Sequence, residues 1–470
     1  MEILFYISIF LPLFLGILAI FFSQNTAKKY LSFNVFCYFV LSVIAIYFLV
    51  TNQTFNNELF VLDWLNIIFY SIILILSFII WLYAISYFAT EIEHKEIGRW
   101  RLKQYNIMIN LFIFSMLFVA LSKNLMVMWI ALEATTIFTT FLISFYNTKS
   151  SWEAAWKYVI LCWIGVTIWL LWLFLIILSW VHNLDIVNPA KEAIVNTKLL
   201  EIAFVFILIW FGTKVWFFPL NSWLPDAHWK WSTPISAFMS SILLPLAFYM
   251  IIRTQSIVDV QLQSSFTSNL MMFFSIITIV YSGFVMLIQH HYKRTLAYSS
   301  SENMWIIAFA WALWTPVAQM FSILHIIGHS FLKTASFMSA WNILLYTHTG
   351  QYDNIKNITK YMKNSSILLV ISLFMLVWLP PSPLFISEIG IIMQAFIVNP
   401  WYAVIFIIWI VLAFTWLLYN FSSLFIDKEN VDDLKKIDKD FTIWFMHLPI
   451  ILSLIIALLI SVVFVMSFNF

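Results

Sequence analysis

Two charged residues lie in the middle of long apolar stretches of this sequence. Lys214 interrupts IAFVFILIWFGTKVWFFPL at 202–220, and Glu133 interrupts LMVMWIALEATTIFTTFLI at 125–143. An unpaired charge inside a membrane is costly, so ionisable residues there are candidates for function. A carboxyl group holds a proton when neutral and pairs with a cation when charged, and a nearby amine changes its charge when that partner moves. The pair is the smallest unit of a proton switch, with a structural ion pair as the alternative.

A second set of ionisable residues has helical spacing. In LHIIGHSFLKTASF, His325, His329 and Lys333 recur at intervals of four, which places them on one helical face. Histidine titrates near neutral pH, so a proton path is the favoured interpretation. Structural hydrogen bonding and metal binding by the two histidines are the alternatives, although no third Cys, Asp or Glu ligand is close in sequence.

Glu388 ends the segment WLPPSPLFISE, in which three prolines prevent a regular helix. Broken helices at membrane depth need protein or a water-filled cavity around their freed backbone groups, and beside ionisable residues they are typical of transporters. A kinked helix with an interfacial carboxylate is the alternative. Three more ionisable residues lie nearer helix ends, namely Asp226, His228 and Glu302. Each is either a point where protons enter the path or a side chain at a solvated helix end.

The composition of the chain places all these residues in a membrane protein. Of its 470 residues, 63% are hydrophobic and only 10% are charged, and the mean hydropathy is +0.94, far from any soluble domain. Cys37 and Cys162 lie inside apolar stretches, so neither a disulfide framework nor a Cys-based metal site is expected. The formal net charge of +2 argues against a large nucleic-acid surface.

Apolar stretches of about 18 residues or more predict fourteen membrane spans. They lie near 4–22, 31–50, 64–88, 107–121, 124–146, 156–181, 199–219, 234–252, 269–289, 295–314, 316–346, 365–397, 401–426 and 441–468. The first stretch lacks a basic region and a cleavage site, and we interpret it as an uncleaved span. Eighteen of the twenty-four Lys and Arg fall in loops after odd-numbered spans, which predicts both termini outside. The expected fold class is an all-α integral membrane protein with a single polytopic domain, 1–470.

Seven strings stand out in order between residues 60 and 425. They are WIALEATT around Glu133, EAAWKY at 153–158, FGTKVWFFPLNSWLPDAH at 211–228, STPISA at 232–237, YKRTLAYSSSENM at 292–304, HIIGHSFLKTASF at 325–337 and LPPSPLFISE at 379–388. Together they resemble the antiporter-like membrane subunits of respiratory complex I, multisubunit cation/proton antiporters and membrane-bound hydrogenases. EATT, HSFLK and the glutamate after PLFIS resemble the hydrogenase-4 and formate hydrogenlyase branch.

The resemblance implies two inverted five-helix repeats, at 107–252 and 269–426. Peripheral helices would occupy 1–106, and a C-terminal helix would occupy 441–470. The seventh and twelfth spans would be the broken helices of the two repeats.

The resemblance also implies roles for the buried charges. Glu133 and Lys214 would form the ion pair of the first half-channel. His325, His329 and Lys333 would link the two halves. Glu388 would occupy the exit position of the second half-channel.

The implied function is proton translocation, driven by redox chemistry in an NADH:quinone oxidoreductase-like or hydrogenase-like complex of the inner (cytoplasmic) membrane. The chain itself would carry no cofactor, and iron–sulfur, flavin or nickel centres would belong to partner subunits. Its partners would be other membrane subunits, a peripheral redox arm, the lipid bilayer, and protons or sodium. The alternatives are a multisubunit sodium/proton antiporter subunit, an inorganic-carbon uptake subunit and a non-conducting scaffold.

One departure from the family bears on conduction. Pro245, in SSILLPLAFY, stands where the family usually has a lysine in its eighth span. The relay from Lys214 toward the centre therefore lacks a protonatable group. Bound water could bridge the gap; otherwise the half-channel is inactive, which makes the scaffold more credible.

A second departure is compositional. The chain has only eight Gly but twenty-four Trp, whereas membrane helices favour Gly and keep Trp largely at interfaces. Trp64, Trp216, Trp305, Trp341 and Trp378 fall where the family commonly has Gly. We hypothesise that many of these codons are read as glycine in the source organism, with a Trp-rich lineage as the alternative.

Peptide mass spectrometry of the native protein tests this hypothesis. We expect glycine at positions 305 and 341, because tryptophan at a site of close backbone approach is overpacked. Tryptophan at both positions contradicts it.

Overall fold

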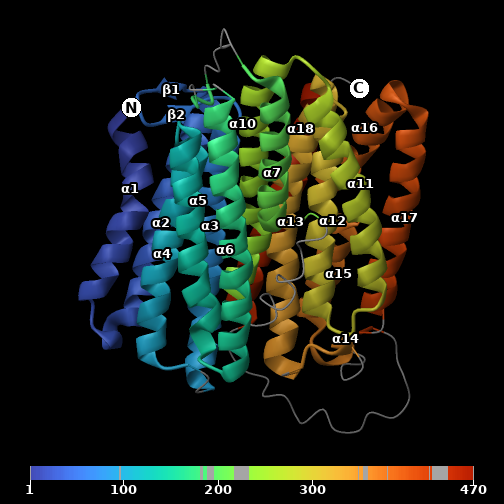
Figure 1. Ribbon diagram of the computed structural model, residues 1–470. Helices are drawn as coiled ribbons and strands as arrows, with labels where there is room; N and C mark the ends of the chain where they lie inside the picture. The colour runs from blue at the N-terminus through green and yellow to red at the C-terminus, as the bar shows by residue number, and fades with distance from the viewer. Residues whose placement is uncertain are drawn as a thin grey trace. The chain divides into compact units, whose positions relative to one another are not determined.

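The computed structural model describes most of the chain, and the description is almost entirely helical (Figure 1). The described residues are 2–94, 97–179, 181, 184–187, 195–215, 217, 232–347, 349–352, 358–377, 379–422, 424–425 and 443–468. Asp226 and His228 lie outside them, as does Pro219, at which a break in the seventh span is expected.

Within this described part, nine helices are long and apolar enough to cross a membrane. They are Glu2–Phe21, Gln24–Thr51, Asn66–Glu93, Arg99–Leu121, Leu125–Tyr146, Thr233–Leu262, Phe266–Leu287, Pro400–Ser422 and Phe445–Ser467. Large apolar side chains on the first of them, such as Ile3, Phe14 and Phe21, are exposed, as expected for a surface that faces lipid. The protein is therefore a multi-pass membrane protein, while the count of fourteen spans stays a prediction.

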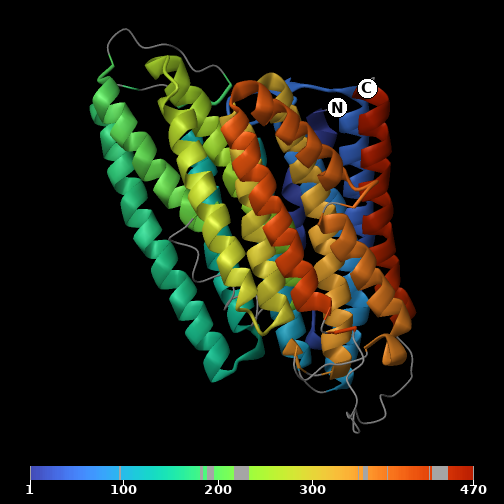
Figure 2. The same ribbon diagram turned by 90° about the vertical axis from the view of Figure 1, so that its right-hand side faces the viewer.

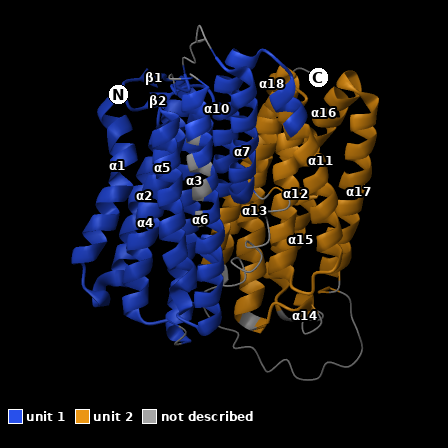
Figure 3. Ribbon diagram, in the orientation of Figure 1, with its two compact units in different colours: residues 1–216, 230–235, 242–270 blue, residues 217–229, 236–241, 271–470 orange. Residues whose placement is uncertain are grey.

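The chain divides into two compact units (Figure 3). Unit 1 comprises Met1–Trp216, Lys230–Ile235 and Ile242–Leu270, and unit 2 comprises Phe217–Trp229, Ser236–Ser241 and Met271–Phe470. The predicted repeats at 107–252 and 269–426 do not share these bounds, and they stay a prediction.

Unit 1 is a bundle of long helices with a short ribbon beside the N-terminus (Figure 1). Its elements are α1 (Glu2–Phe21), η1 (Gln24–Thr26), α2 (Ala27–Thr51), β1 (Phe55–Asn56), β2 (Val61–Leu62), α3 (Asn66–Glu93), α4 (Arg99–Leu121), α5 (Leu125–Ile143), η2 (Ser144–Tyr146), α6 (Lys149–Leu178), α7 (Thr197–Val215) and α10 (Leu244–Leu262). β1 and β2 are antiparallel. The helix pairs that pack most extensively are α1 with α4, α2 with α3, α4 with α5, α6 with α7, and α7 with α10.

Hydrogen bonds between polar side chains join the helices of unit 1. Tyr70 of α3 donates to Ser8 of α1 at 2.7 Å, and Tyr38 of α2 donates to the Asn110 side-chain oxygen of α4 at 2.8 Å. In lipid there is no hydrophobic drive between helices, so such contacts help to fix which faces meet.

Unit 2 is built around one long central helix, and its helices run side by side (Figure 2). Its elements include η3 (Met239–Leu243, which ends in unit 1), α11 (Phe266–Leu287, which begins in unit 1), α12 (Tyr292–Ala312), α13 (Pro316–Thr347), α14 (Ile358–Tyr361), α15 (Lys363–Leu376), α16 (Pro383–Val398), α17 (Pro400–Ser422) and α18 (Ile443–Phe468). α13 packs against α12, α15, α16 and α18. It begins at a proline, and Thr315 before it accepts from the Ala318 amide at 3.1 Å.

Prolines interrupt two helical segments. α9 (Thr233–Phe238), η3 and α10 follow one another directly, and η3 is a π-helical turn just before Pro245. Proline has no N–H and its ring clashes with the carbonyl four residues back, which widens the helix there. A second interruption separates α15, which ends at Leu376, from α16, which begins at Pro383.

Three of the tryptophans that we hypothesise to be glycines lie in the described residues. Trp305 and Trp341 are buried, whereas Trp64 is exposed. The Trp305 indole nitrogen has no hydrogen-bond partner among the described residues, an unfavourable state for a buried donor.

An ion pair fixes the start of α3 in unit 1. Arg253 of α10 donates to both Asp63 carboxylate oxygens, at 2.7 and 2.5 Å. Asp63 also accepts from the backbone amides of Leu65 and Asn66 at 2.9 Å each, which satisfies free donors at the helix start. One carboxylate therefore caps α3 and attaches it to α10.

Replacement of Arg253 by Met is expected to lower the melting temperature of the detergent-solubilised protein. The Asp63 carboxylate would lose its cation, at a cost of about 2 kcal/mol, less than for a fully buried pair because the Asp63 side chain is 21% exposed. Arg99→Met is the control, since the contact of Arg99 with Asn25 is exposed. Equal melting temperatures for the two variants would contradict this role.

Candidate functional site

The two charges predicted to pair lie on two helices of unit 1. Glu133 comes from α5, whose start is capped by the Asn124 side chain accepting from the Met126 amide, and Lys214 comes from the end of α7. The Lys214 Nζ lies 3.9 Å from Glu133 Oε1, and the side chains are 2% and 16% exposed. The structure thus brings the predicted partners together away from bulk solvent.

A hydroxyl group is the direct partner of this amine. Lys214 Nζ donates a hydrogen bond to Thr136 Oγ1. The distance of 3.9 Å to Glu133 exceeds hydrogen-bond length, so that attraction is electrostatic only. Glu133 Oε1 is buried and has no hydrogen-bond partner among the described residues. The amine is therefore held by a neutral hydroxyl rather than by the carboxylate next to it.

Hydroxyl groups extend this cluster along α5. Thr139 shares a hydrogen bond of 2.8 Å with the Tyr158 hydroxyl of α6, and both side chains are buried. Thr139 lies three residues after Thr136, so the two hydroxyls share one side of the helix. Together with Lys214 they form a polar row in an otherwise apolar bundle.

The residues predicted to share a helical face in unit 2 do so on α13. His325, His329 and Lys333 are all fully buried. His325 lies between two helices, with Nε2 3.0 Å from the Asn303 side-chain oxygen of α12 and Nδ1 2.9 Å from the Ser387 hydroxyl of α16. Because the Asn303 side-chain oxygen only accepts, Nε2 donates to it, while the Ser387 hydroxyl that faces Nδ1 donates to the Leu384 carbonyl at 2.8 Å.

His329 contacts the π-helical turn. Its Nε2 lies 3.3 Å from the Ser240 carbonyl oxygen, which again requires a proton on Nε2. In a π-helical turn the donor for this carbonyl belongs to the residue five positions on, which is Pro245 and has no N–H. The histidine supplies the missing donor. Its Nδ1 is buried without a hydrogen-bond partner among the described residues.

Lys333, on the same face of α13 as the two histidines, contacts α12. Its Nζ donates to the Leu296 carbonyl at 3.0 Å and to the Ser299 hydroxyl. It interacts electrostatically with the carboxylate of Glu302, one turn beyond Ser299. The amine is again held by neutral oxygens with a carboxylate near it, as Lys214 is in unit 1.

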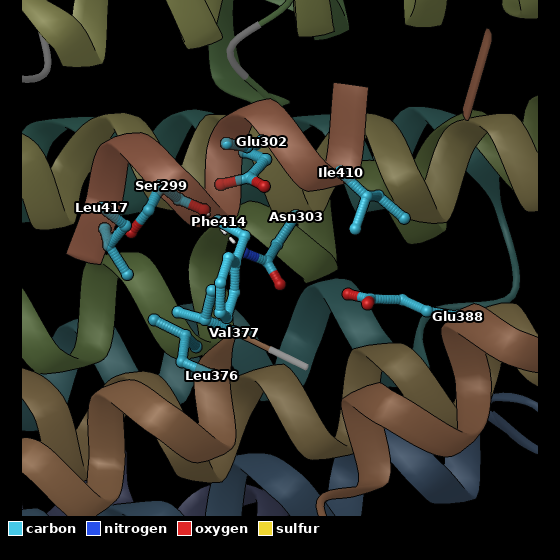
Figure 4. A pocket seen from close by; sticks show the side chains of 10 residues that line it. Ser299, Glu302, Asn303, Leu376, Val377, Glu388, Ile410, Phe414 and Leu417 are labelled. Carbon is cyan, nitrogen blue, oxygen red and sulfur yellow. Dashed lines mark hydrogen bonds between the residues drawn. The ribbon is translucent and has the colours of Figure 1, made fainter. Parts of the chain in front are cut away.

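Glu302 and Glu388 line one small cavity in unit 2 (Figure 4). Its wall consists of Ser299, Glu302, Asn303, Leu376, Val377, Glu388, Ile410, Ala413, Phe414 and Leu417. The sequence placed Glu302 near a helix end, but α12 runs from Tyr292 to Ala312 and Glu302 is at its middle. Of the two interpretations of Glu302, the solvated helix end does not fit this position, because most of the polar start YKRTLAYSSSEN is buried and helical.

The metal interpretation of the histidines finds no ligand set within the described residues. No group of three His, Cys, Asp or Glu side chains there is arranged to hold a metal ion. Three of the four ring nitrogens face Ser387, Asn303 and the Ser240 carbonyl instead. The other two interpretations, proton relay and structural hydrogen bonding, agree with this geometry.

Sequence reasoning missed the neutral members of both clusters. Thr136 and Tyr158 lie in strings singled out above, and Asn303 directly follows Glu302, but only contacts between helices show what they bind. A separate buried carboxylate, Glu91 of α3, was also missed; it interacts with Tyr87, whose hydroxyl lies 2.5 Å from that of Tyr146. Its position at the end of an apolar stretch gave no periodic signal.

The fold and these clusters define a multi-pass membrane protein with buried, hydroxyl-supported lysines, histidines and carboxylates. The family described as "NADH:quinone oxidoreductase/Mrp antiporter, TM" matches residues 122–415. The chain belongs to this family, as the seven sequence strings indicated.

Similar proteins include a hydrogenase-4 component homolog and a quinone oxidoreductase chain. The chain is 30% identical over 400 residues to "Hydrogenase-4 component F homolog" of Methylacidiphilum infernorum, covering 82% of this chain and 83% of that protein. It is 30% identical over 187 residues to "NAD(P)H-quinone oxidoreductase chain 4-3" of a Nostoc species, covering 39% of this chain and 33% of that protein.

One solved structure shares the fold over nearly the whole chain. It is a chain from "Structure of the membrane-bound sulfane sulfur reductase (MBS), an archaeal respiratory membrane complex". The TM-score is 0.83 at 20% identity, covering 99% of this chain and 95% of that chain.

Gly328 permits the close approach of α13 to α16 that places Ser387 on His325. A Cβ at this position would lie 2.7 Å from the Pro383 ring and 2.7 Å from a Leu384 methyl. Gly328→Ala is therefore expected to lower stability by about 1–3 kcal/mol and to weaken the His325–Ser387 contact.

Thermal unfolding in detergent measures the effect, with Gly98→Ala as the control. A Cβ at Gly98 meets nothing within 4 Å. If both variants unfold at the same temperature, α13 and α16 are not in the close contact described.

Proposed function

We propose that this chain is a proton-translocating membrane subunit of a redox-driven complex, of the NADH:quinone oxidoreductase or membrane-bound hydrogenase type. Membership of the family and the similarity to subunits of both types support this function. The chain moves ions, and the electron-transfer chemistry belongs to its partner subunits.

The observation that carries the proposal is the arrangement of Lys214 between a hydroxyl and a carboxylate. The charged amine is stabilised by the Glu133 carboxylate at 3.9 Å, while Thr136 accepts its hydrogen bond. When Glu133 takes up a proton or moves away, the buried ammonium loses its compensating charge and its proton is released more easily. Proton uptake by one residue is thereby coupled to proton release by the other.

Within unit 2, the proposed proton path continues along His325, His329 and Lys333 of α13. His329 keeps one ring nitrogen available as an acceptor, and His325 joins Asn303 to Ser387, which directly precedes Glu388. A proton that reaches this row can pass between Lys333, the histidines and the carboxylates by small side-chain movements or through water. Asp226 and His228 stay candidates for points where protons enter.

The finer architecture belongs to the same proposal. Fourteen spans, inverted repeats at 107–252 and 269–426, both termini outside and an inner-membrane location follow from the charge distribution and the family. The break between α15 and α16 supports a discontinuous twelfth span. The proposed partners are further membrane subunits and a peripheral redox arm.

One observation favours a non-conducting scaffold as a second candidate. Pro245 provides no protonatable side chain, and the residues on either side of it in α10 are apolar and buried. Conduction beyond Lys214 then requires water. A scaffold keeps its partners assembled and active whether or not Glu133 can ionise.

Glu133→Gln tests conduction directly. In the complex purified from native membranes and placed in liposomes, we expect redox-driven proton uptake per electron to fall by at least severalfold, because the amide cannot switch charge. Lys214→Met is expected to have the same effect, since it removes the other half of the pair.

Matched controls come from an exposed pair on α6. Glu153 and Lys157 lie 2.8 Å apart with side chains 66% and 54% exposed, so Glu153→Gln and Lys157→Met remove the same charges at the surface. The ratio of protons to electrons should be unchanged in both. A normal ratio in Glu133→Gln, in a fully assembled complex, would establish the scaffold instead.

A further inference from the structure

A groove opens on the surface of unit 2 between α15 and α18. Its volume is about 290 Å³, and its walls are Asn364, Ile367 and Leu368 of α15 and His447, Leu448 and Ile451 of α18. A cavity that holds one water needs only about 10–15 Å³. The groove therefore has room for a much larger, mainly apolar occupant.

The groove arises because α15 and α18 share a third helix as their main partner. Each of them packs more extensively against α13 than against the other. A hydrogen bond of 2.9 Å between His447 Nε2 and the Ser365 hydroxyl joins α15 and α18 near their starts, and both residues are buried. Further along, Ile367 and Ile451 line the groove and are exposed. A molecule in the groove would bridge the two helices.

The polar side chains of the groove lie toward one end of it. Asn364 precedes Ile367 and Leu368 on α15, and His447 precedes Ile451 on α18. His447 is only 6% exposed, and because it lines the groove, its ring faces the occupant. The groove thus offers polar contacts near the helix starts and apolar walls beyond them.

Positive charge lies beside the polar end of the groove. Lys363 begins α15 directly before Asn364, Lys360 belongs to α14, and both lysines are exposed. Figure 1 shows α14 at the end of unit 2 where α15 starts. Because α14, α15 and α18 contain no Asp or Glu, no carboxylate of these helices neutralises the two amines. The predicted topology places these lysines on the cytoplasmic side.

We propose that this groove binds one anionic phospholipid, with its phosphate at Lys360, Lys363 and Asn364 and one acyl chain between α15 and α18. A phosphodiester has a negative charge and oxygen acceptors, which match two ammonium groups and an amide donor. Basic pockets between membrane helices on the cytoplasmic side suit such headgroups. An extended acidic peptide would satisfy the lysines too, but it would bring unpaired backbone groups against apolar walls.

The bound lipid would act on the helix that carries His325, His329 and Lys333. α13 packs against both walls of the groove, and Ser453 of α18 donates to the Phe331 carbonyl of α13 at 2.7 Å. A lipid that joins α15 to α18 therefore stabilises the helices that surround α13. Its binding does not depend on which ion the protein moves, so it goes beyond the proposed function.

Photolabelling of the purified complex in liposomes tests the site. The probe is phosphatidylglycerol with a diazirine in one acyl chain, present as a minor component of a phosphatidylcholine membrane, and peptide mass spectrometry locates the label. We expect label at 364–368 and 447–451, in severalfold excess over the exposed Phe14 and Phe21 of α1. Unlabelled phosphatidylglycerol should remove this label, whereas the same amount of added phosphatidylcholine should not.

A double variant tests the contact with the headgroup. Lys360→Gln combined with Lys363→Gln should reduce the label in the groove severalfold, because the phosphate loses both cations. The control is Lys28→Gln combined with Lys29→Gln, which removes an exposed pair from the start of α2 and should keep the full label.

A second variant tests the contact with the acyl chain. Ile367→Phe places a larger side chain in the groove and should reduce the label even though both lysines are intact. Ile371→Phe is the control, since Ile371 is exposed one turn further along α15 and is not part of the wall. Glu133→Gln should keep the full label, which separates the lipid site from conduction.

Three results would overturn the proposal. Label in the groove that does not exceed the label on α1, as when a partner subunit covers the groove, excludes a bound lipid in the complex. Equal competition by phosphatidylcholine shows ordinary boundary lipid without selection for charge. Equal loss of label in the two double lysine variants shows a general attraction to basic side chains and no defined site.

Discussion

The cost of an uncompensated charge in a low-dielectric interior governs this structure. Lys214 and Lys333 are both buried, and each is held by a neutral hydroxyl first and by a carboxylate at longer range. Apolar side chains gain nothing from leaving lipid for another helix, so polar contacts decide which helical faces meet. The same contacts that make the charges tolerable therefore set the packing of the helices that carry them.

Helix interruptions supply part of that compensation. Pro245 leaves the Ser240 carbonyl without its helical donor, and His329 takes that donor's place. At the other break, Ser382 donates to the Met375 carbonyl near the end of α15, while its oxygen accepts from the Leu384 amide at the start of α16. Backbone groups freed by proline thus bind side chains near the ionisable row. Pro245 removes a protonatable side chain, but it also orients a histidine.

The sequence was most informative where geometry follows from spacing alone. His325, His329 and Lys333 share a face because intervals of four allow no other outcome on a helix, and the break before Pro383 follows from three prolines. The pairing of Glu133 with Lys214 came from resemblance, since no local rule joins residues eighty positions apart. Thr136, Asn303 and Ser387 escaped notice because threonine, asparagine and serine are common in membrane helices and acquire meaning only from the partner that the fold brings to them.

Glu302 shows why hydropathy misplaces functional residues. The polar start of α12 has the composition of a loop, yet it is buried because its serines bind side chains of neighbouring elements rather than water. A helix that is polar for functional reasons loses the apolar signal by which spans are recognised. The residues that matter most for transport are thus those that the span count tends to assign to its edges.

The two buried clusters differ in the number of titratable groups that they bring together, and this difference bears on proton movement. In unit 1 one amine lies 3.9 Å from one carboxylate. In unit 2 the amine of Lys333 interacts electrostatically with Glu302, Glu302 interacts with Glu388, and two buried histidines share the helical face of the amine. A change of charge at one member of the second cluster alters the electrostatic environment of several others, whereas in the first cluster it alters that of one partner. The two units therefore need not perform the same step of transport.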